Sequence, residues 1–265
     1  MNESVLYEQS GGIVTLTLNE PDTLNAVSEG IVAGLVAAAE RINGDLSVGC
    51  VIVTGAGRAF SSGGNVRQMR DRTGLFAGNP AEIRRAYLHG IQRIPLALYN
   101  IEAPTIAAVN GHAVGAGCDI SLMCDIRIAS EEAIFAESFL RVGLVSGDGG
   151  AWFLPRIVGM SRACEMTFTG DFIDAATAAG YGLVSRVVPA DALMQDAVAL
   201  ATRIAAQPPH ALRMTKRLLR ESQRVELDTA LELASAMQAI VQHTDDQSEA
   251  VNALLEKRPP QFRGS

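Results

Sequence analysis

The chain has 265 residues, of which 48% are hydrophobic, so it is long and apolar enough to bury one large core or a core with a smaller second part. Its formal net charge of −7 at pH 7 and its 5% aromatic content argue against nucleic acid as the main partner, because phosphate binding needs a basic surface and base stacking needs aromatic platforms. An anionic small ligand is not excluded, since it needs only a local cluster of cations.

The cysteines and histidines are scattered along the chain, and their spacing does not match a metal site. No metal is therefore expected, and the thiols are expected to be small buried side chains in a reducing compartment. The first residues lack the basic and apolar regions of a signal peptide, and no apolar run approaches the roughly 18 residues of a membrane-spanning helix. The sequence predicts a cytoplasmic protein without a membrane partner.

Strands and helices alternate from the start of the chain. The alternation of apolar residues over 14–18 and the apolar run over 50–54 predict strands. Between them, Ser28 is expected to cap a helix that continues to about Ile42. The next segment, 61–80, is rich in Gly, Ser, Asn and Arg, which predicts a loop with a broken helix, and 82–98 is predicted to be helical.

The most informative stretch runs from Ile106 to Asp119. Its apolar start, 106–109, predicts a buried strand, and a turn with several glycines leads from it into an apolar helical run over 120–124. The free N–H groups and the dipole at the start of a helix favour a developing negative charge. Since Asp119 lies about one turn into this helix, the segment offers an oxyanion site with a carboxylate beside it.

The rest of the chain divides into a mixed part and a helical part. Further strands are predicted at 125–129, 133–136 and 183–188, helical pieces at 151–158 and 161–168, and a glycine-rich loop at 143–150. Long helical patterns without strands follow at 191–206, 210–220 and 225–241. This order predicts an α/β core over residues 1–190 and a helical region over 191–265.

A second glycine-rich segment, 59–65, follows the strand predicted at 50–54. Taken alone it is equally well a surface turn. Facing the first glycine-rich turn, it would supply a second N–H donor, and two donors stabilise an enolate or a tetrahedral oxyanion by several kcal/mol. The spacing of Gly111, Gly115 and Gly117 is not that of a dinucleotide-binding loop, and no P-loop motif occurs.

A series of short segments carries a family resemblance. They are Leu18–Ala26, Arg58–Asn65, Pro104–Gly111, Gly115–Asp119, Met123–Arg127, Thr169–Gly170, Gly182–Val188 and Glu256–Phe262. Together, and in this order, they resemble the crotonase (enoyl-CoA hydratase/isomerase) family over nearly the whole chain. The resemblance implies a spiral of ββα units with a C-terminal helical region that builds a trimer or a dimer of trimers. It also implies an acyl-CoA thioester substrate and no separate cofactor, because coenzyme A is part of the substrate.

The resemblance also implies roles for individual residues. The thioester carbonyl would lie between the N–H groups of Gly64 and Ala116. The positions implied to lie near CoA are Asn25, Ala26, Ser62 and Asn65, with Lys257 and Phe262 approaching from the C-terminal segment, often across a subunit contact.

The acid and base positions depart from the hydratase pattern of two glutamates. The first is Asp119, and the second falls on Phe139, which cannot transfer protons and would line the substrate site. Two substitutes are open. Glu137 would share the face of Phe139 in an extended segment, and Asp148 lies in a loop where isomerases of this family, including those that open a phenylacetyl-CoA epoxide, carry an aspartate. Trp152, which follows this loop, is expected in the core or the pocket wall.

These departures slightly favour isomerisation of a double bond or ring by Asp148 with Asp119, because isomerisation needs one well-placed base. Hydration of a 2-enoyl-CoA stays open, with Asp119 and either Asp148 or Glu137 as the acid–base pair. Each carboxylate also has a structural interpretation: a helix-start cap for Asp119, a turn former for Asp148 and a solvated strand residue for Glu137. The alternatives to an isomerase or hydratase are a CoA-ester binding protein with little catalysis and a thioester hydrolase of the same fold.

Overall fold

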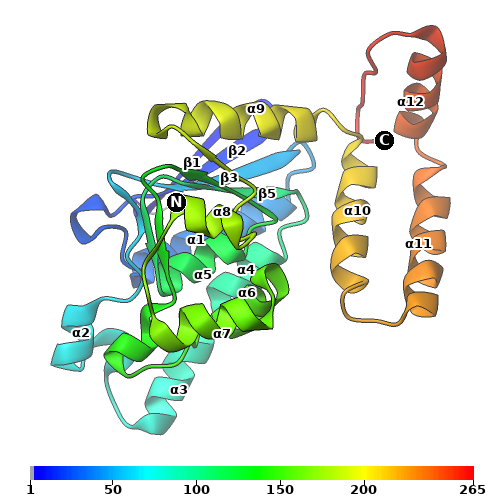
Figure 1. Cartoon of the computed structure of the whole chain (residues 1–265). Coiled ribbons are helices and arrows are strands. Elements are labelled where there is room, and N and C mark those ends of the chain that lie inside the picture. Colours follow the sequence, from blue (N-terminus) through cyan, green and yellow to red (C-terminus); the bar gives the residue numbers. More distant parts are fainter. Residues whose placement is uncertain (1–2) are drawn as a thin grey trace.

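The computed structural model describes residues 3–265, and in it the chain alternates between a six-stranded and a four-stranded sheet (Figure 1). The larger sheet has the order β1 (Val5–Ser10), β2 (Ile13–Leu18), β3 (Cys50–Gly55), β5 (Thr105–Val109), β7 (Ile126–Ser130) and β10 (Arg186–Val188). The smaller sheet has the order β4 (Ala59–Ser61), β6 (His112–Val114), β8 (Ile134–Ala136) and β9 (Ile173–Asp174).

The two sheets are built from repeated ββα units. Strands β3, β5 and β7 pair in parallel in the larger sheet, and β4, β6 and β8 pair in parallel in the smaller one. Each strand of the first group is followed along the chain by one of the second, and β6 leads directly into α5 (Ala116–Leu122). Because parallel neighbours need a crossover connection, the short second strand and the helix supply it. This is the spiral that the resemblance implies.

The other helices surround this core. They are α1 (Glu29–Asn43), α2 (Val66–Asp71), α3 (Pro80–His89), α4 (Arg93–Tyr99), α6 (Gly150–Val158), α7 (Met160–Thr169), α8 (Ala175–Gly180), α9 (Leu193–Ala205), α10 (Pro209–Glu221), α11 (Leu227–Val241) and α12 (Asp245–Glu256). Within residues 3–265, none of them combines the length and the apolar character needed to cross a bilayer.

The strongly periodic elements agree with the sequence predictions. The strands predicted at 14–18, 50–54 and 106–109 are β2, β3 and β5, and Ser28 caps α1 by accepting a hydrogen bond from the Ile31 N–H. The single helix predicted over 82–98 is wrong, because the chain breaks at Gly90 into α3 and α4. Strands β1, β4 and β6 and helix α12 were not predicted, and β6 occupies part of the turn expected after β5.

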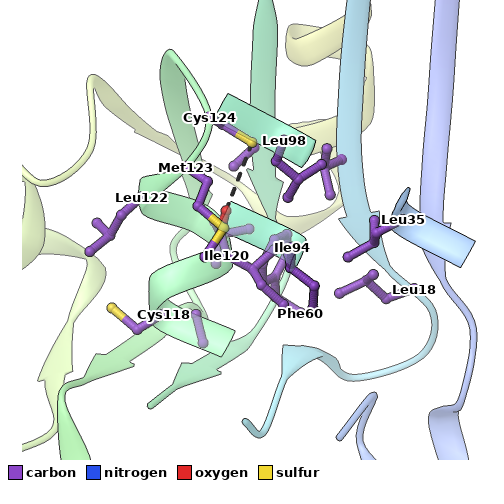
Figure 2. Packing of buried hydrophobic residues seen from close by; sticks show 14 of the residues in the cluster. Leu18, Leu35, Phe60, Ile94, Leu98, Cys118, Ile120, Leu122, Met123 and Cys124 are labelled. Carbon is purple, nitrogen blue, oxygen red and sulfur yellow. Dashed lines mark hydrogen bonds between the residues drawn. The ribbon is translucent and has the colours of Figure 1, made fainter. Parts of the chain in front are cut away.

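The main core lies between the sheets and the helices packed against them. Leu18 of β2, Leu35 of α1, Phe60 of β4, Ile94 of α4 and Ile120 of α5 point toward one another (Figure 2), and each is at most 1% exposed. Burial of such a side chain contributes about 1.5–3 kcal/mol. This cluster therefore fixes α5, whose first turn carries Asp119, against the strands that precede it.

The C-terminal helices divide into one that covers the sheet and three that extend from it (Figure 1). In α9, Leu193, Ala197 and Ala201 pack against a second buried cluster that includes Ile52 of β3 and Ile106 of β5. Helices α10, α11 and α12 project to one side of the core. Of residues 191–265, the segment after α9 is therefore the part that stands apart.

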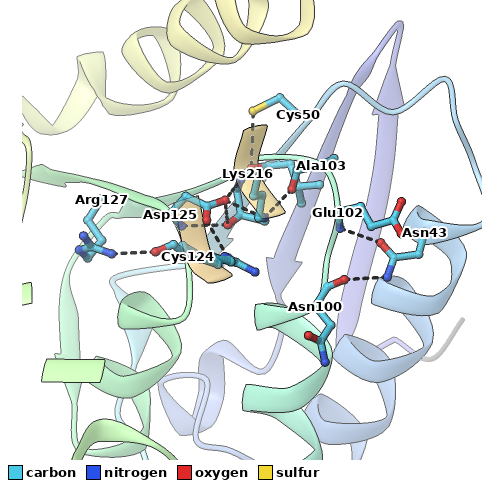
Figure 3. Close-up of polar contacts among 12 residues, drawn as sticks. Asn43, Cys50, Asn100, Glu102, Ala103, Cys124, Asp125, Arg127 and Lys216 are labelled. Carbon is cyan, nitrogen blue, oxygen red and sulfur yellow. Dashed lines mark hydrogen bonds and ion pairs between the residues drawn. The ribbon is translucent and has the colours of Figure 1, made fainter. Parts of the chain in front are cut away.

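A buried ion-pair network fastens α10 to the core (Figure 3). The Lys216 ammonium donates to the Ala103 carbonyl at 2.7 Å and lies 2.7 Å from the Asp125 carboxylate, whose other oxygen is 2.6 Å from Arg220. Burial lowers the pKa of Lys216 to about 8, although Asp125 opposes this shift. Loss of one partner from such a buried pair leaves the other charge uncompensated.

Lys216→Met is therefore expected to lower the free energy of unfolding by about 3 kcal/mol, since Asp125 loses one cation and keeps Arg220 and the hydrogen bonds from Thr105. Denaturant unfolding followed by circular dichroism measures this change. The adjacent Arg217 is exposed, so Arg217→Met removes a cation from the same helix and should change stability by no more than about 0.5 kcal/mol. Equal losses in the two variants would contradict an anchoring role for Lys216.

Candidate functional site

Two glycine-rich turns lie against each other where the strands of the smaller sheet end. At Gly63, where φ is +78°, an added Cβ would meet the Val114 carbonyl oxygen and would lie 3.1 Å from the Ala116 nitrogen. Gly63 thus permits both a left-handed conformation and the close approach of the two backbones. The neighbouring Gly64 and Ala116 N–H groups donate to no partner among residues 3–265.

Gly64 and Ala116 both line a cavity of about 290 Å³. Apolar side chains form most of its wall. The apolar lining includes Val27, Val66, Met69, Leu75, Phe76, Ile91, Val114, Phe139, Val142, Leu144 and Phe172, and the polar lining comprises Ser62, Asn65, Gln68, Tyr87, Ser138, Arg141 and Asp148. Two free N–H groups in a largely apolar cavity can bind an oxygen that gains negative charge.

Three buried carboxyl groups lie beside this cavity. Asp119, Glu137 and Asp148 are 0%, 1% and 3% exposed. They come from the first turn of α5, the residue after β8 and the loop before α6. Asp119 is the central member, because its side chain interacts with those of both Glu137 and Asp148. Its Oδ2 also accepts a hydrogen bond from the Ser146 hydroxyl at 3.1 Å.

Burial raises the pKa of all three carboxyl groups. The pKa values of Asp119 and Asp148 lie well above the usual range, chiefly through desolvation and then through the charge of a neighbouring carboxylate. Desolvation raises the pKa of Glu137 to about 7, against the lowering effect of the Asp119 and Cys118 side chains. Each of the three therefore resists ionisation more strongly than an exposed carboxyl group does.

Only one of the three, Asp148, lines the cavity. Asp119 and Glu137 do not line it, and Asp119 interacts with each of the other two. The interactions link the three acids into a carboxyl row in the order Asp148, Asp119, Glu137, with only Asp148 at the cavity. No group of three or more His, Cys, Asp or Glu side chains in the described part of the chain is arranged to hold a metal ion.

The premise that placed Glu137 on the same strand face as Phe139 is wrong. Strand β8 ends at Ala136, and the chain then enters a 3₁₀ turn over Ser138–Val142, so the two side chains diverge. Phe139 lines the cavity next to Gly115, whereas Glu137 is buried behind it. Glu137 is thus neither a solvated strand residue nor a cavity-facing substitute for the missing second glutamate.

The residues expected near CoA separate into two groups. Ser62 and Asn65 line the cavity, whereas Asn25 and Ala26 do not. The Asn25 side chain is fully buried and accepts from the Glu20 N–H while it donates to the carbonyls of Ala56 and Ala59. Its polar groups are therefore used to hold the loop before α1 against β4.

Three further candidates lie away from the cavity of this chain. Trp152 packs edge-on against Tyr99 and Phe153, with the Arg156 guanidinium 4.1 Å from its ring centre. It belongs to the helix packing behind the site. Lys257 directly follows α12, and Phe262 belongs to the final segment of the chain, which lies beside α12 on the side to which the C-terminal helices project (Figure 1).

Sequence reasoning missed two residues that shape the carboxyl row. Ser146 holds Asp119, and its position in the glycine-rich loop at 143–150 was the only available signal. Gly150, the first residue of α6, has no space for a side chain, because an added Cβ would collide with Oδ1 of Asp119 and lie 2.8 Å from Oδ2. The start of α6 therefore packs closely against the Asp119 carboxyl.

Gly150→Ala is expected to displace the Asp119 carboxyl and to destabilise the protein by about 1–3 kcal/mol, the usual cost of an overpacked site. Gly180, the last residue of α8, meets no atom within 4 Å at the same added Cβ. Gly180→Ala should accordingly change stability by less than about 1 kcal/mol. Thermal unfolding of both variants measures the difference, and a Gly150→Ala protein as stable as Gly180→Ala would contradict the close contact.

The chain was then compared with known proteins. A sequence profile of the family described as enoyl-CoA hydratase/isomerase matches residues 8–265. Two enzymes of Escherichia coli are similar to the chain at 34% identity over 100% of each sequence: a 1,2-epoxyphenylacetyl-CoA isomerase and a 2,3-dehydroadipyl-CoA hydratase. The crystal structure of an enoyl-CoA hydratase from Bacillus anthracis is similar with a TM-score of 0.92 and 32% identity, over 99% of this chain and 100% of that one. The chain therefore belongs to the enoyl-CoA hydratase/isomerase family of enzymes, which has the crotonase fold.

Proposed function

We propose that the chain isomerises the double bond or ring of an unsaturated acyl-CoA, with Asp148 as the group that transfers the proton. The observation that supports this most directly is that Asp148 is the one carboxyl of the row that lines the cavity also lined by Gly64 and Ala116. The apolar wall suits an acyl group. The N–H groups of Gly64 and Ala116 hold the thioester carbonyl, while Ser62 and Asn65 lie beside the CoA arm.

The proton transfer follows from one base and two donors. Asp148 takes a proton from Cα of a 3-enoyl-CoA, and the electron pair of the broken C–H bond moves into a dienolate whose oxygen accepts from the two N–H groups. The resulting carboxylic acid returns the proton to Cγ, which leaves the double bond between Cα and Cβ. No atom is gained or lost, so a single acid–base group is enough.

Hydration of a 2-enoyl-CoA is the second candidate. It is favoured by the direct contact between Asp119 and Asp148, which would supply a base for water and an acid for Cα. The E. coli relatives include one isomerase and one hydratase at the same identity, so identity alone does not separate the two reactions. What favours isomerisation is the placement of Phe139, rather than a second carboxylate, in the cavity wall.

The test is the absorbance of the conjugated thioester in two separate assays. With a medium-chain 3-enoyl-CoA, isomerisation makes the absorbance rise; with the trans-2-enoyl-CoA, hydration makes it fall. We expect a rise in the first assay that is faster than any fall in the second. A rapid fall in the second assay with no rise in the first would favour hydration. Release of free CoA would instead indicate a thioester hydrolase. Isomerisation of a ring is tested in the same way with a ring epoxide of phenylacetyl-CoA as the substrate.

The proposed site also includes a second copy of the chain. Lys257 and Phe262 lie away from the cavity of their own chain, so they can reach CoA only from a neighbouring subunit. The projecting helices expose large apolar side chains, among them Leu227, Leu231, Leu254 and Leu255. We expect light scattering to give a mass of three or six times the chain mass of 28.0 kDa. A monomeric mass would remove Lys257 and Phe262 from the proposed site.

A further inference from the structure

Glu137 is a buried acid that the proposed reaction does not use directly. Its side chain is 1% exposed and does not line the cavity. Its side chain interacts with the carboxyl of Asp119 and the thiol of Cys118. Neither of its carboxyl oxygens has a hydrogen-bond partner within residues 3–265. A carboxylate in this position is stabilised only by the protons of its two acidic neighbours.

The charged and titratable groups that face Glu137 come from two elements. Helix α5 contributes Asp119 and Cys118, and the loop before α6 contributes the charge of Asp148. The nearest cationic influence in the cluster, from Arg127, acts on Cys118. The buried row thus lacks a cation of its own, so each added negative charge meets both desolvation and repulsion.

The interactions of Asp119 with Asp148 and with Glu137 give the row two places where neighbouring carboxyl groups can share a proton. With a proton in each place, the three carboxyl groups carry one negative charge. Glu137 is the suited holder of that charge, because the acidic groups of Asp119 and Cys118 both lower its pKa, which burial raises to about 7.

We propose that Glu137 is the inner end of a three-carboxyl proton relay and acts through Asp119 to make Asp148 a base. The inference rests on the proposed function only in taking Asp148 as the group that meets the substrate. When a substrate carbon gives its proton to Asp148, the shared proton of Asp148 moves to Asp119, and the shared proton of Asp119 moves to Glu137. The electron pair of the broken C–H bond stays on the substrate as the enolate. Return of the proton to the substrate reverses each transfer.

The relay has a defined pH dependence. Below a pH of about 7, Glu137 is protonated, and the row holds three protons and has no free site for another. Above it, the row carries one charge and can accept the substrate proton. The rate constant kcat is therefore expected to fall as the pH drops through about 7, with a slope set by a single ionisation.

Glu137→Met tests the relay, because methionine has a similar volume and cannot hold a proton. In this variant the negative charge must lie on Asp119 or Asp148, whose pKa values burial raises well above the usual range. We therefore expect the acidic limb of the profile, the pH range over which kcat falls as the pH is lowered, to move up by about one pH unit or more. At pH 7 kcat should fall by about tenfold or more and recover at higher pH, with little change in KM. Glu137→Asp should restore the limb to its original position with a lower maximum. An unmoved limb in Glu137→Met would overturn the relay.

Phe135→Leu is the matched control for packing. Phe135 lies on β8 two residues before Glu137, is fully buried and has no titratable group. This variant should lower the thermal midpoint and leave the acidic limb in place. If Phe135→Leu moves the limb as far as Glu137→Met does, the effect belongs to packing, and the relay is wrong.

A ligand-free measurement separates the relay from the proposed reaction. Infrared difference spectra of the protein between pH 6 and 8 should show a protonated carboxyl band that titrates, and Glu137→Gln should abolish it. If the wild-type protein shows this band but turns over no enoyl-CoA, the result would support Glu137 as the group that holds the proton and would contradict the proposed function. Persistence of the same band in Glu137→Gln would contradict the relay whatever the substrate.

Discussion

Asp148→Asn is expected to lower kcat for the isomerisation by about 10²–10⁴, the range that general acid–base catalysis contributes. Asparagine has nearly the shape of aspartate and can donate to Asp119, but it cannot accept the substrate proton. Asp148 is the one member of the carboxyl row that lines the cavity, so Asp119 cannot replace it without a movement of α5. Steady-state kinetics with the 3-enoyl-CoA measures the loss, and KM should change little.

The thermal stability of Asp148→Asn shows whether a loss of activity comes from the missing acid or from a damaged fold. Asp148→Asn removes a buried acid whose pKa is raised by desolvation and by Asp119, so its thermal midpoint should equal or exceed that of the wild type. The matched control is Asp174→Asn, because Asp174 is exposed and caps α8, a position that asparagine fills equally well. Full activity in Asp148→Asn would remove Asp148 from the mechanism.

Ala116→Pro is expected to lower kcat by about 10²–10³, which corresponds to about 2.7–4 kcal/mol for one oxyanion donor. Ala116 is the first residue of α5, where proline is well tolerated because the N–H has no intrahelical partner. The substitution therefore removes the proposed donor while the helix itself should persist. Circular dichroism checks the fold, and turnover of the 3-enoyl-CoA checks the loss.

Ala116→Ser provides the comparison, since it retains the backbone N–H and adds one hydroxyl to the same place. It should keep kcat within about tenfold of the wild type. The difference in kcat between the serine and proline variants therefore measures the contribution of the Ala116 N–H. Gly64 offers no equally clean test, because an added Cβ there would lie 2.6 Å from the Met69 methyl group. A proline variant as active as the serine variant would show that the Ala116 N–H does not bind the oxyanion.

Local sequence patterns were sufficient to predict a helix or strand where the element is long and one of its faces is buried. The alternation of β2, the apolar runs of β3 and β5 and the capped, amphipathic α1 could be predicted because these signals depend on residues adjacent in the chain. Strands β4 and β6 have only three residues each, and they exist because they pair with each other. Periodicity cannot detect an element of that length.

The candidate site divides in the same way. The two glycine-rich turns and the carboxylate at 119 could be proposed from the sequence, since a strand that runs into glycines and a helix has few backbone solutions. The sequence could not show which of the three acids faces the cavity. Glu137 and Phe139 differ by two positions, and the end of β8 at Ala136 alone decides which of them lines the cavity.

The sequence by itself therefore determined the family, the order of the core elements and the pair of N–H donors proposed to hold the carbonyl. The tertiary structure decided that Asp119, Glu137 and Asp148 form a buried row, that Asp148 alone of the three lines the cavity, and that Ser146 and Gly150 fix the middle member. The physical reason is desolvation. The pKa of a carboxyl group depends on the neighbours and the burial that the whole fold imposes, and no short stretch of sequence encodes either of them.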